Sequence, residues 1–207
     1  INKKTLNIDE DLIEKKIDKR TSAILPVHVF GNPCNVEKID KIAKKNKLKV
    51  IYDASHAFNT TFKGKSILNY GDISVVSFHA TKIFHTIEGG ALITNNNKLA
   101  DKIRMLSNFG KNKNKDFQIL GINAKMNEFQ AAMGLCNLSE FSKLLKIRKK
   151  IWHLYFKELK YYFWFQEFNK FSSPNFSYFP LVFSNEKQLK KTLNILLKEK
   201  INVRRYF

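Results

Sequence analysis

Four polar residues in the first half of the chain have types and spacing that could support chemistry. Asp53 and His56 follow the apolar run "LKVIY", and Ser77 and Lys82 follow the apolar run "ISVV". A lysine at the edge of a buried site can have its pKa lowered by desolvation, which makes its amine a nucleophile toward carbonyl groups. An aspartate beside it can keep a proton on a pyridine nitrogen. A serine hydroxyl can bind a phosphate, and an imidazole can lie against an aromatic ring.

Pyridoxal phosphate (PLP) is a cofactor that requires this set of side chains, since the lysine forms a Schiff base with it. Each residue also has an ordinary structural interpretation. An aspartate at the end of a strand often caps a turn, Gly89-Gly90 is a common turn by itself, and single loop residues are usually solvated. His79 and His85 are expected to be packed or surface residues without a chemical role. Spacing alone leaves both interpretations open.

The strands and helices predicted around these residues alternate along the sequence. Apolar runs predict strands at residues 22–31, 48–55, 73–78 and 90–94. Helical spacing predicts a helix over 35–47 with Asn35 as its N-cap, and another over 97–110 that is closed by Gly110. Strands that alternate with helices indicate an α/β fold with a largely parallel sheet, and ligands bind beyond the carboxyl ends of such strands.

The second half of the chain has a different pattern. Residues 110–121 are polar and predict a loop, and 126–138 and 143–160 predict helices, the second amphipathic with a solvated basic face. Strand-like runs then occupy 161–168, 178–183 and 202–207, with a helix predicted over 186–200. We therefore expect residues 1–140 to be part of a large α/β domain. Residues 141–207 are expected to form a connecting helix and an incomplete α+β subdomain.

Composition narrows the class of protein. The 207 residues carry a formal net charge of +19, which suits nucleic acid, an anionic membrane surface or anionic small molecules. The lysines are spread along the chain rather than clustered with aromatic residues, which argues against nucleic acid. No run is apolar enough to span a membrane, and no signal peptide opens the chain, so we expect a cytoplasmic protein. Cys34 and Cys136 lack metal-ligand spacing and suggest neither a zinc site nor a disulfide.

Four separated segments together resemble the DegT/DnrJ/StrS family of sugar aminotransferases. They are "PVHVFGNPCNVEKI", "VIYDASHAF", "FKGKSILNYGDISVVSFHATKIFHTIEGGALIT" and "GINAKMNEFQAAMGLCNL", with a weaker echo at "INVRRYF". The resemblance implies a fold type I, aspartate aminotransferase-like PLP enzyme. It implies that Lys82 forms the Schiff base, that Asp53 pairs with the pyridine nitrogen, that His56 stacks on the ring and that Ser77 binds the cofactor phosphate.

The resemblance also implies partners. Asn123, and more weakly Lys125, would reach the cofactor phosphate of a neighbouring subunit, which means a homodimer with shared active sites. Some relatives have histidine in place of the lysine and act as dehydratases, so Lys82 favours aminotransfer. The sequence around Lys82 is similar to that of enzymes that act on dTDP-linked 4-keto- or 3-keto-6-deoxyhexoses with glutamate as amino donor. Such enzymes supply amino sugars for lipopolysaccharide O-antigens and other surface glycans.

One departure from the family pattern limits this hypothesis. The family places a phosphate-binding segment and a ring-covering aromatic residue upstream of the region seen here, so we expect the chain to be a fragment that lacks its N-terminal and C-terminal parts. The alternative is a catalytically inactive fragment with only a folding or partner-binding role. A basic nucleic-acid module is a further alternative, which strong salt-dependent DNA binding would favour.

Overall fold

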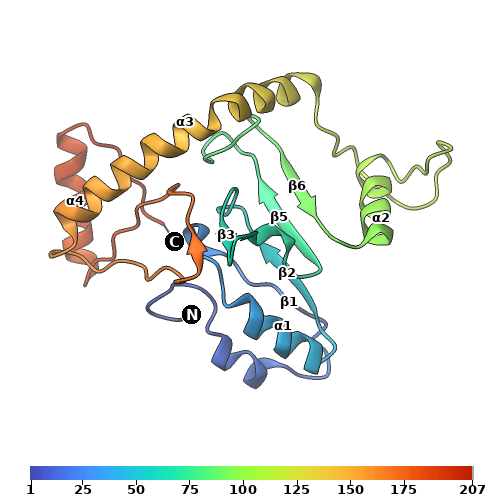
Figure 1. Cartoon of the computed structure of the whole chain (residues 1–207), viewed down its shortest axis with the longest axis horizontal. Coiled ribbons are helices and arrows are strands. Elements are labelled where there is room, and N and C mark those ends of the chain that lie inside the picture. The colour runs from blue at the N-terminus through green and yellow to red at the C-terminus, as the bar shows by residue number, and fades with distance from the viewer. Residues whose placement is uncertain (207) are drawn as a thin grey trace.

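The computed structural model describes residues 1–206 and is built around a four-stranded sheet (Figure 1). The strand order is β1–β2–β5–β6, and the strands are β1 (Ala23–Ile24), β2 (Lys49–Asp53), β5 (Ile73–Ser77) and β6 (Gly90–Ile93). β2 pairs in parallel with both β1 and β5, and β5 pairs antiparallel with β6. All four strands lie within the apolar runs from which they were predicted.

The other elements surround this sheet. The helices are α1 (Val36–Lys45), α2 (Asn97–Ser107), α3 (Glu128–Leu159) and α4 (Glu186–Lys198), with short 3-10 helices at Glu10–Leu12, Glu14–Lys16, Val29–Gly31 and Ile67–Asn69. A second sheet, antiparallel and in the order β4–β3–β7, consists of β3 (Thr61–Phe62), β4 (Lys65–Ser66) and β7 (Ser172–Ser173). The β3–β7 pairing brings the C-terminal part of the chain back to the residues that follow β2.

The main core forms between α1 and the parallel strands. Val50 and Tyr52 alternate with more exposed neighbours along β2, as expected for a strand with one buried face. The buried face of α1 contains Val36, Ile39, Ile42 and Ala43. The side chain of Asn35 accepts a hydrogen bond from the Lys38 amide at 3.2 Å, so the predicted N-cap is confirmed.

The edge strand β6 departs from the expected parallel arrangement. Residues 78–89 connect β5 to β6 without a helix, whereas adjacent parallel strands are usually joined by a crossover that contains one. The chain therefore reverses, and Ser77 pairs with Gly90. A Cβ at Gly90 would lie 2.8 Å from the Val76 carbonyl oxygen, so glycine permits this close pairing. The sheet is parallel from β1 to β5 and antiparallel at its β6 edge.

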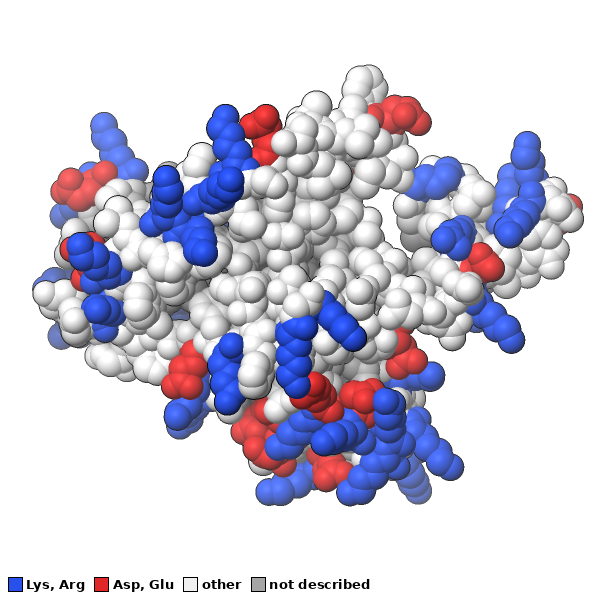
Figure 2. Space-filling model, in the orientation of Figure 1, with Lys and Arg blue, Asp and Glu red and all other residues white. Residues whose placement is uncertain are grey.

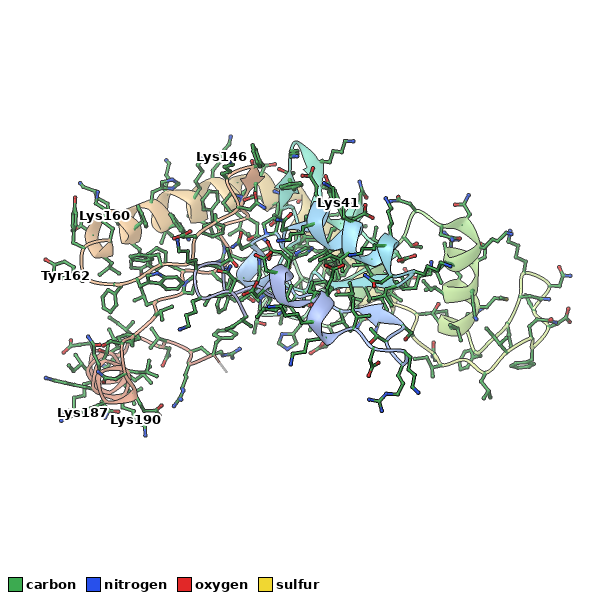
Figure 3. The ribbon with its side chains drawn as sticks, turned by 90° about the horizontal axis from the view of Figure 1, so that it is seen from below. Lys41, Lys146, Lys160, Tyr162, Lys187 and Lys190 are labelled. Carbon is green, nitrogen blue, oxygen red and sulfur yellow. The ribbon has the colours of Figure 1, made fainter. Side chains whose placement is uncertain are left out.

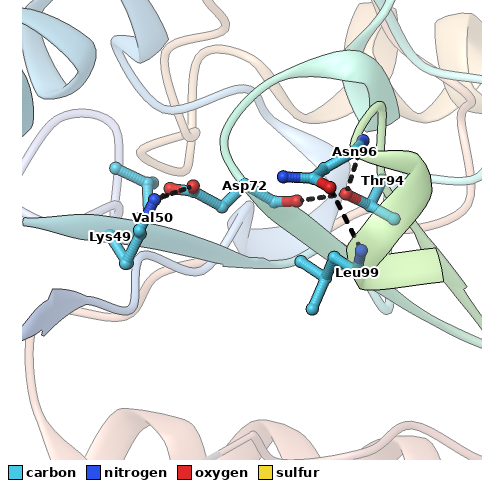
Figure 4. Close-up of polar contacts among 6 residues, drawn as sticks. All are labelled: Lys49, Val50, Asp72, Thr94, Asn96 and Leu99. Atoms are coloured by element: carbon cyan, nitrogen blue, oxygen red, sulfur yellow. Dashed lines mark hydrogen bonds and ion pairs between the residues drawn. The ribbon is translucent and has the colours of Figure 1, made fainter. Parts of the chain in front are cut away.

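Asp72 connects the strands at the end opposite the polar residues Asp53 and Ser77 (Figure 4). Its carboxylate accepts hydrogen bonds from the Val50 amide and from Lys49 Nζ, both at 2.9 Å. Its carbonyl accepts one from Thr94 Oγ1 at 2.7 Å, just after β6. These contacts fix the positions of β2, β5 and β6 relative to one another, and so the positions of the loops at their other ends.

Helix α3 is continuous where the sequence suggested two helices. It begins with a capping box formed by Asn127 and Gln130 and crosses the top of the molecule in Figure 1. Phe141 is buried, but Ile147 and Ile151 are each about half exposed, so the described chain covers the apolar side of this helix only in part. The boundary expected between residues 140 and 141 lies within α3, and the division into two domains stays a prediction.

The strand predictions for the C-terminal region were wrong, whereas the helix prediction was confirmed as α4. Residues 161–168 and 178–183 contribute one isolated bridge, Trp164 to Val182, and 201–206 form no strand; Phe207 lies outside the described residues. Pro174 and Pro180 interrupt the region and cannot donate backbone hydrogen bonds. Its aromatic rings pack on α3 instead, where Trp152 contacts Phe168, Phe176 and Phe179 of this region and stacks on Phe156 of its own helix.

The positive charge is dispersed over the surface. Figure 2 shows lysine and arginine in separate groups, and the group at the bottom of this view is mixed with acidic side chains. Lys146 and Lys160 on or beside α3, and Lys187 and Lys190 on α4, point away from the ribbon in Figure 3. The drawn face has no continuous basic stripe of the kind that a nucleic-acid interface needs. Among the described residues, no helix has the length and apolarity to cross a bilayer.

Candidate active site

The structure brings Asp53, His56, Ser77 and Lys82 to one edge of the sheet. Asp53 is the last residue of β2 and pairs with Val75 on the neighbouring strand β5. Ser77 is the last residue of β5, two positions further along. His56 and Lys82 follow in the loops that leave these strands. Because β2 and β5 are parallel, their carboxyl ends lie side by side, which is where open α/β sheets bind ligands.

The Asp53 carboxylate has a local structural contact. One of its oxygens accepts a hydrogen bond from the Ser55 amide at 2.9 Å, which stabilises the turn after β2. The Asp53 side chain is half-buried, and its backbone bonds to Pro26 and His28 on the adjacent segment. The interpretation of Asp53 as a turn-capping residue is therefore confirmed. The same hydrogen bond also restricts how the carboxylate can rotate.

His56 lies among three aromatic rings. The Tyr178 ring centroid is 4.5 Å away, and the rings of Phe30 and Tyr206 are at 5.9 Å and 6.5 Å. Burial, helped by the charge of Lys82 and opposed by Asp53, lowers the pKa of His56 to about 4. His56 is therefore neutral at physiological pH and lies within electrostatic reach of both partners. Its Nδ1 is buried and has no hydrogen-bond partner among the described residues.

Lys82 projects from a loop that is anchored by aromatic packing. Phe84 stacks on Phe58 with ring centroids 4.5 Å apart and meets Phe78 edge-on at 4.9 Å. The Lys82 amide donates to the His79 carbonyl at 2.9 Å, which closes a turn. The side chain is half-buried, and within residues 1–206 its amine has no hydrogen-bond or ion-pair partner. The loop thus presents an unpaired amine near the carboxyl ends of β2 and β5.

The histidines of the two Phe-His pairs have structural contacts. His79 Nδ1 lies 2.8 Å from Thr81 Oγ1, and its Nε2 lies 3.4 Å from the Glu88 carboxylate. The His85 carbonyl accepts a hydrogen bond from Asn137 of α3 at 2.7 Å. The Ser77 hydroxyl is the fourth candidate: its Oγ accepts a long hydrogen bond from the His79 amide at 3.3 Å, so its own proton can be donated to another acceptor. His79 is exposed and His85 is half-buried, and the expectation that neither has a chemical role stays a prediction.

Asn123 and Lys125 do not join the other four residues within this chain. They lie in the segment 108–127, which extends with α2 to the right of the sheet in Figure 1. Both are exposed, and Lys125 Nζ donates to Asn123 Oδ1 at 2.8 Å and to Asn108 Oδ1 at 3.0 Å. The two side chains are thus connected to each other on an outward-facing arm.

Sequence reasoning missed the residues that surround His56. Phe30 has a positive φ of 54°, which is strained for an aromatic residue and invisible in the sequence. Tyr178 and Tyr206 are more than 100 positions from His56, and only the stretch "INVRRYF" gave a weak signal for the second. Asn175, whose buried amide bonds to the His56 carbonyl, had no sequence signal at all.

Comparisons with known proteins find relatives along almost the whole chain. The chain is 43% identical over 201 residues to a dTDP-4-amino-4,6-dideoxy-D-glucose transaminase of Shigella dysenteriae, covering 94% of this chain and 54% of that protein. It is 38% identical over 150 residues to a GDP-perosamine synthase of Caulobacter vibrioides, covering 72% and 40%. The solved structure of Helicobacter pylori PseC, an aminotransferase involved in pseudoaminic acid biosynthesis, matches with a TM-score of 0.83 and 30% identity, covering 97% and 56%.

The chain thus spans about half the length of the curated relatives it matches. Its fold is the α/β fold of these aminotransferases, fold type I, which confirms the expected class. The model of the DegT/DnrJ/EryC1/StrS aminotransferase family matches residues 1–207. The chain belongs to the DegT/DnrJ/EryC1/StrS aminotransferase family.

Proposed function

We propose that this chain carries part of the active site of a PLP-dependent aminotransferase that acts on nucleotide-linked keto sugars. The observation that carries the proposal is the convergence of Lys82, Asp53, Ser77 and His56 at the carboxyl ends of two adjacent parallel strands. Two of these residues hold polar atoms that have no hydrogen-bond partner within residues 1–206 and so suit a ligand: the amine of Lys82 and the buried Nδ1 of His56. The side chains present therefore fit PLP.

When bound, PLP supplies an electron sink for the carbanion that forms when the amino donor loses its Cα proton. Lys82 would hold the cofactor covalently until the amino donor displaces it, and its freed amine would then take up and return that proton as general base and general acid. Asp53 would pair with the pyridine nitrogen and keep it protonated, and the Ser77 hydroxyl would donate to the phosphate. His56, neutral because burial lowers its pKa, would pack against the ring without adding a second positive charge beside Lys82.

A dTDP-linked 4-keto- or 3-keto-6-deoxyhexose is the proposed acceptor, with glutamate as donor. The Shigella dysenteriae relative, named as a dTDP-sugar transaminase, supports dTDP because it matches almost the whole chain at 43% identity. The GDP-linked and PseC relatives act in related sugar pathways by their names, so the nucleotide is a property to be measured. Synthesis of O-antigen or another surface glycan, in the cytoplasm, belongs to the same proposal.

We further propose a homodimer in which the arm 108–127 reaches the partner's site. Phe117, Leu120 and Ile122 on this arm are each more than two thirds exposed, which is unusual for apolar side chains unless another surface covers them. Asn123 and Lys125 lie beside them and face outward. In a twofold dimer these residues can serve the active site of the other subunit.

The cofactor test uses the complete protein that contains this chain. PLP should produce a visible absorption band on binding, which glutamate should bleach, and Lys82→Ala should abolish the band. A band that survives in Lys82→Ala would refute the role of Lys82. No band in the unaltered complete protein would contradict PLP binding, and a band that glutamate does not bleach would count against aminotransfer. A band in the complete protein but none in this chain alone would favour the inactive-fragment alternative.

The shared site can be tested by subunit mixing. Lys82→Ala and Asn123→Ala subunits should each be impaired alone, whereas a mixed dimer contains one intact site if Asn123 acts across the interface. Random mixing should then restore about one quarter of the unaltered activity, since half of the dimers are mixed and each has one good site. A mixture with no more activity than its components would contradict the shared site.

A further inference from the structure

The position of His56 depends on a segment that begins more than 100 residues later in the chain. Asn175 is almost completely buried, with 1% of its surface exposed. Its amide nitrogen donates to the His56 carbonyl at 2.9 Å and to the Phe58 carbonyl at 2.8 Å. Its Oδ1 accepts from the Ser177 amide at 3.1 Å. Both hydrogens of the Asn175 amide are therefore used to hold the turn that contains His56.

The ring of His56 is held by the same C-terminal segment and by Phe30. Tyr178, three residues after Asn175, packs on the His56 ring at a centroid distance of 4.5 Å. Phe30 lies nearly parallel to that ring, at an interplanar angle of 9° and a distance of 5.9 Å. The next residue, Gly31, has a φ of 82°, and a Cβ there would lie 2.6 Å from the His56 carbonyl and 3.2 Å from Asn175 Oδ1. The segment 175–178 and the residues Phe30 and Gly31 therefore contact both the backbone and the ring of His56.

We propose that Asn175 is a positioning residue: its hydrogen bonds fix the His56 backbone, and this places the imidazole where it can pack against the cofactor ring. The packing against the cofactor rests on the proposed function, whereas the hold on the His56 backbone concerns only this chain. Asn175 acts through His56 and does not touch the reacting atoms. Its two donated hydrogen bonds replace the backbone partners that the His56 and Phe58 carbonyls would have in a regular element.

Asn32 provides a matched control. It is fully buried, its amide donates to the Glu167 carbonyl at 2.9 Å and to the Thr5 carbonyl at 3.4 Å, and its Oδ1 accepts from the Asn169 amide at 3.0 Å. It ties the C-terminal part to the same side of the molecule without bonding to His56. A loss of stability alone should appear equally in Asn32→Ala and Asn175→Ala, whereas a change at His56 should appear only in the Asn175 variants.

The first experiment is NMR on the unaltered protein and these variants. The unaltered protein should show nuclear Overhauser contacts from the Asn175 amide hydrogens to the backbone of His56 and Phe58; their absence would overturn the proposal without any variant. In Asn175→Ala, and in the isosteric Asn175→Asp, which removes both donors, the pKa of His56 should rise from about 4 toward 6.5 as the ring is released. Asn32→Ala should leave it near 4. Equal effects in all three variants would also overturn the proposal.

The second experiment measures PLP affinity of the complete protein. Two part-buried carbonyl groups without donors should weaken PLP binding by about tenfold in Asn175→Asp, with little change in Asn32→Ala. A released His56 with unchanged PLP affinity would refute the stacking of His56 on the cofactor, and so the proposed function at this residue, while the hold of Asn175 on His56 would stand. An unchanged His56 would refute the role of Asn175 itself.

Discussion

The strands that carry the candidate site and the C-terminal region that packs against them are stabilised in different ways. Between residues 22 and 94 the buried side chains are mostly apolar, with Ile39, Tyr52 and Ile67 almost completely enclosed. Among residues 143–206 only two side chains are buried, and both are amides: Gln166 and Asn175. The first region is stabilised mainly by burial of apolar area, whereas the second combines half-exposed aromatic packing on α3 with directed hydrogen bonds to the first region.

This difference shows why the two regions were not equally predictable. Apolar burial leaves a periodic pattern in the sequence, since strands and helices repeat every 2 and 3.6 residues. A hydrogen bond from one amide to a distant carbonyl leaves no pattern. Gln166, for example, donates to the Thr5 and Val29 carbonyls at 2.7 Å and 3.0 Å, across more than 130 positions of sequence.

The largest expected effect concerns the sheet region and its chemistry. Lys82→Ala should lower the transamination rate by about 10³-fold or more, because both the covalent attachment and the proton transfer are lost. Stability should be nearly unchanged, since the Lys82 amine makes no hydrogen bond or ion pair among the described residues. Initial rates with glutamate and a nucleotide keto sugar check this, with the exposed Lys98→Ala as control. A comparable loss in the control would point to general damage.

The next effect separates apolar burial in the two regions. Ile39→Ala should destabilise the protein by about 2–5 kcal/mol, because it leaves a cavity between α1 and the sheet. Ile195→Ala in α4, where the isoleucine is half-exposed, should change the free energy of unfolding by less than about 1 kcal/mol. Urea unfolding of both variants measures this. Similar losses in the free energy of unfolding at Ile39 and Ile195 would contradict the proposed difference between the two regions.

A pH effect should also arise in the sheet region. Burial lowers the pKa of His28 from 6.5 to about 3, so the folded state holds it neutral while the unfolded state takes up a proton below about pH 6.5. Stability should therefore be complete above pH 6.5 and decline as the pH falls toward 3, by about 2 kcal/mol at about pH 5. Comparing unfolding of the unaltered protein and His28→Gln across this range checks it. A parallel decline in both would exclude His28 as the cause.

The smallest effect tests the attachment of the C-terminal region. Gln166→Ala removes the donor to two part-buried carbonyl groups and should lower the free energy of unfolding by about 1–2 kcal/mol. We expect the loss to appear first as faster proteolysis of the region after α3, with the sheet still folded. Limited proteolysis with mass spectrometry of the fragments detects this. Simultaneous cleavage throughout the chain would mean that the two regions unfold together.

Much of the fold could be predicted from local patterns. The four apolar runs became strands, α1 has the predicted cap and buried face, and the chemistry-bearing residues lie where the ends of parallel strands place them. The C-terminal strands were predicted wrongly because aromatic and β-branched residues favour strands only where a partner strand is available. Here Pro174 and Pro180 interrupt the pairing, and the rings found better contacts on Trp152 of α3.

The sequence by itself determined which side chains could do chemistry and which strands carry them, because residue type and periodicity are local properties. Only the tertiary structure decided that β6 runs antiparallel, that Phe30 takes a strained backbone conformation, and that Asn175 and Tyr178 enclose His56. These features depend on contacts between residues far apart in the chain, whose geometry is set by how the elements pack and not by any one stretch of sequence.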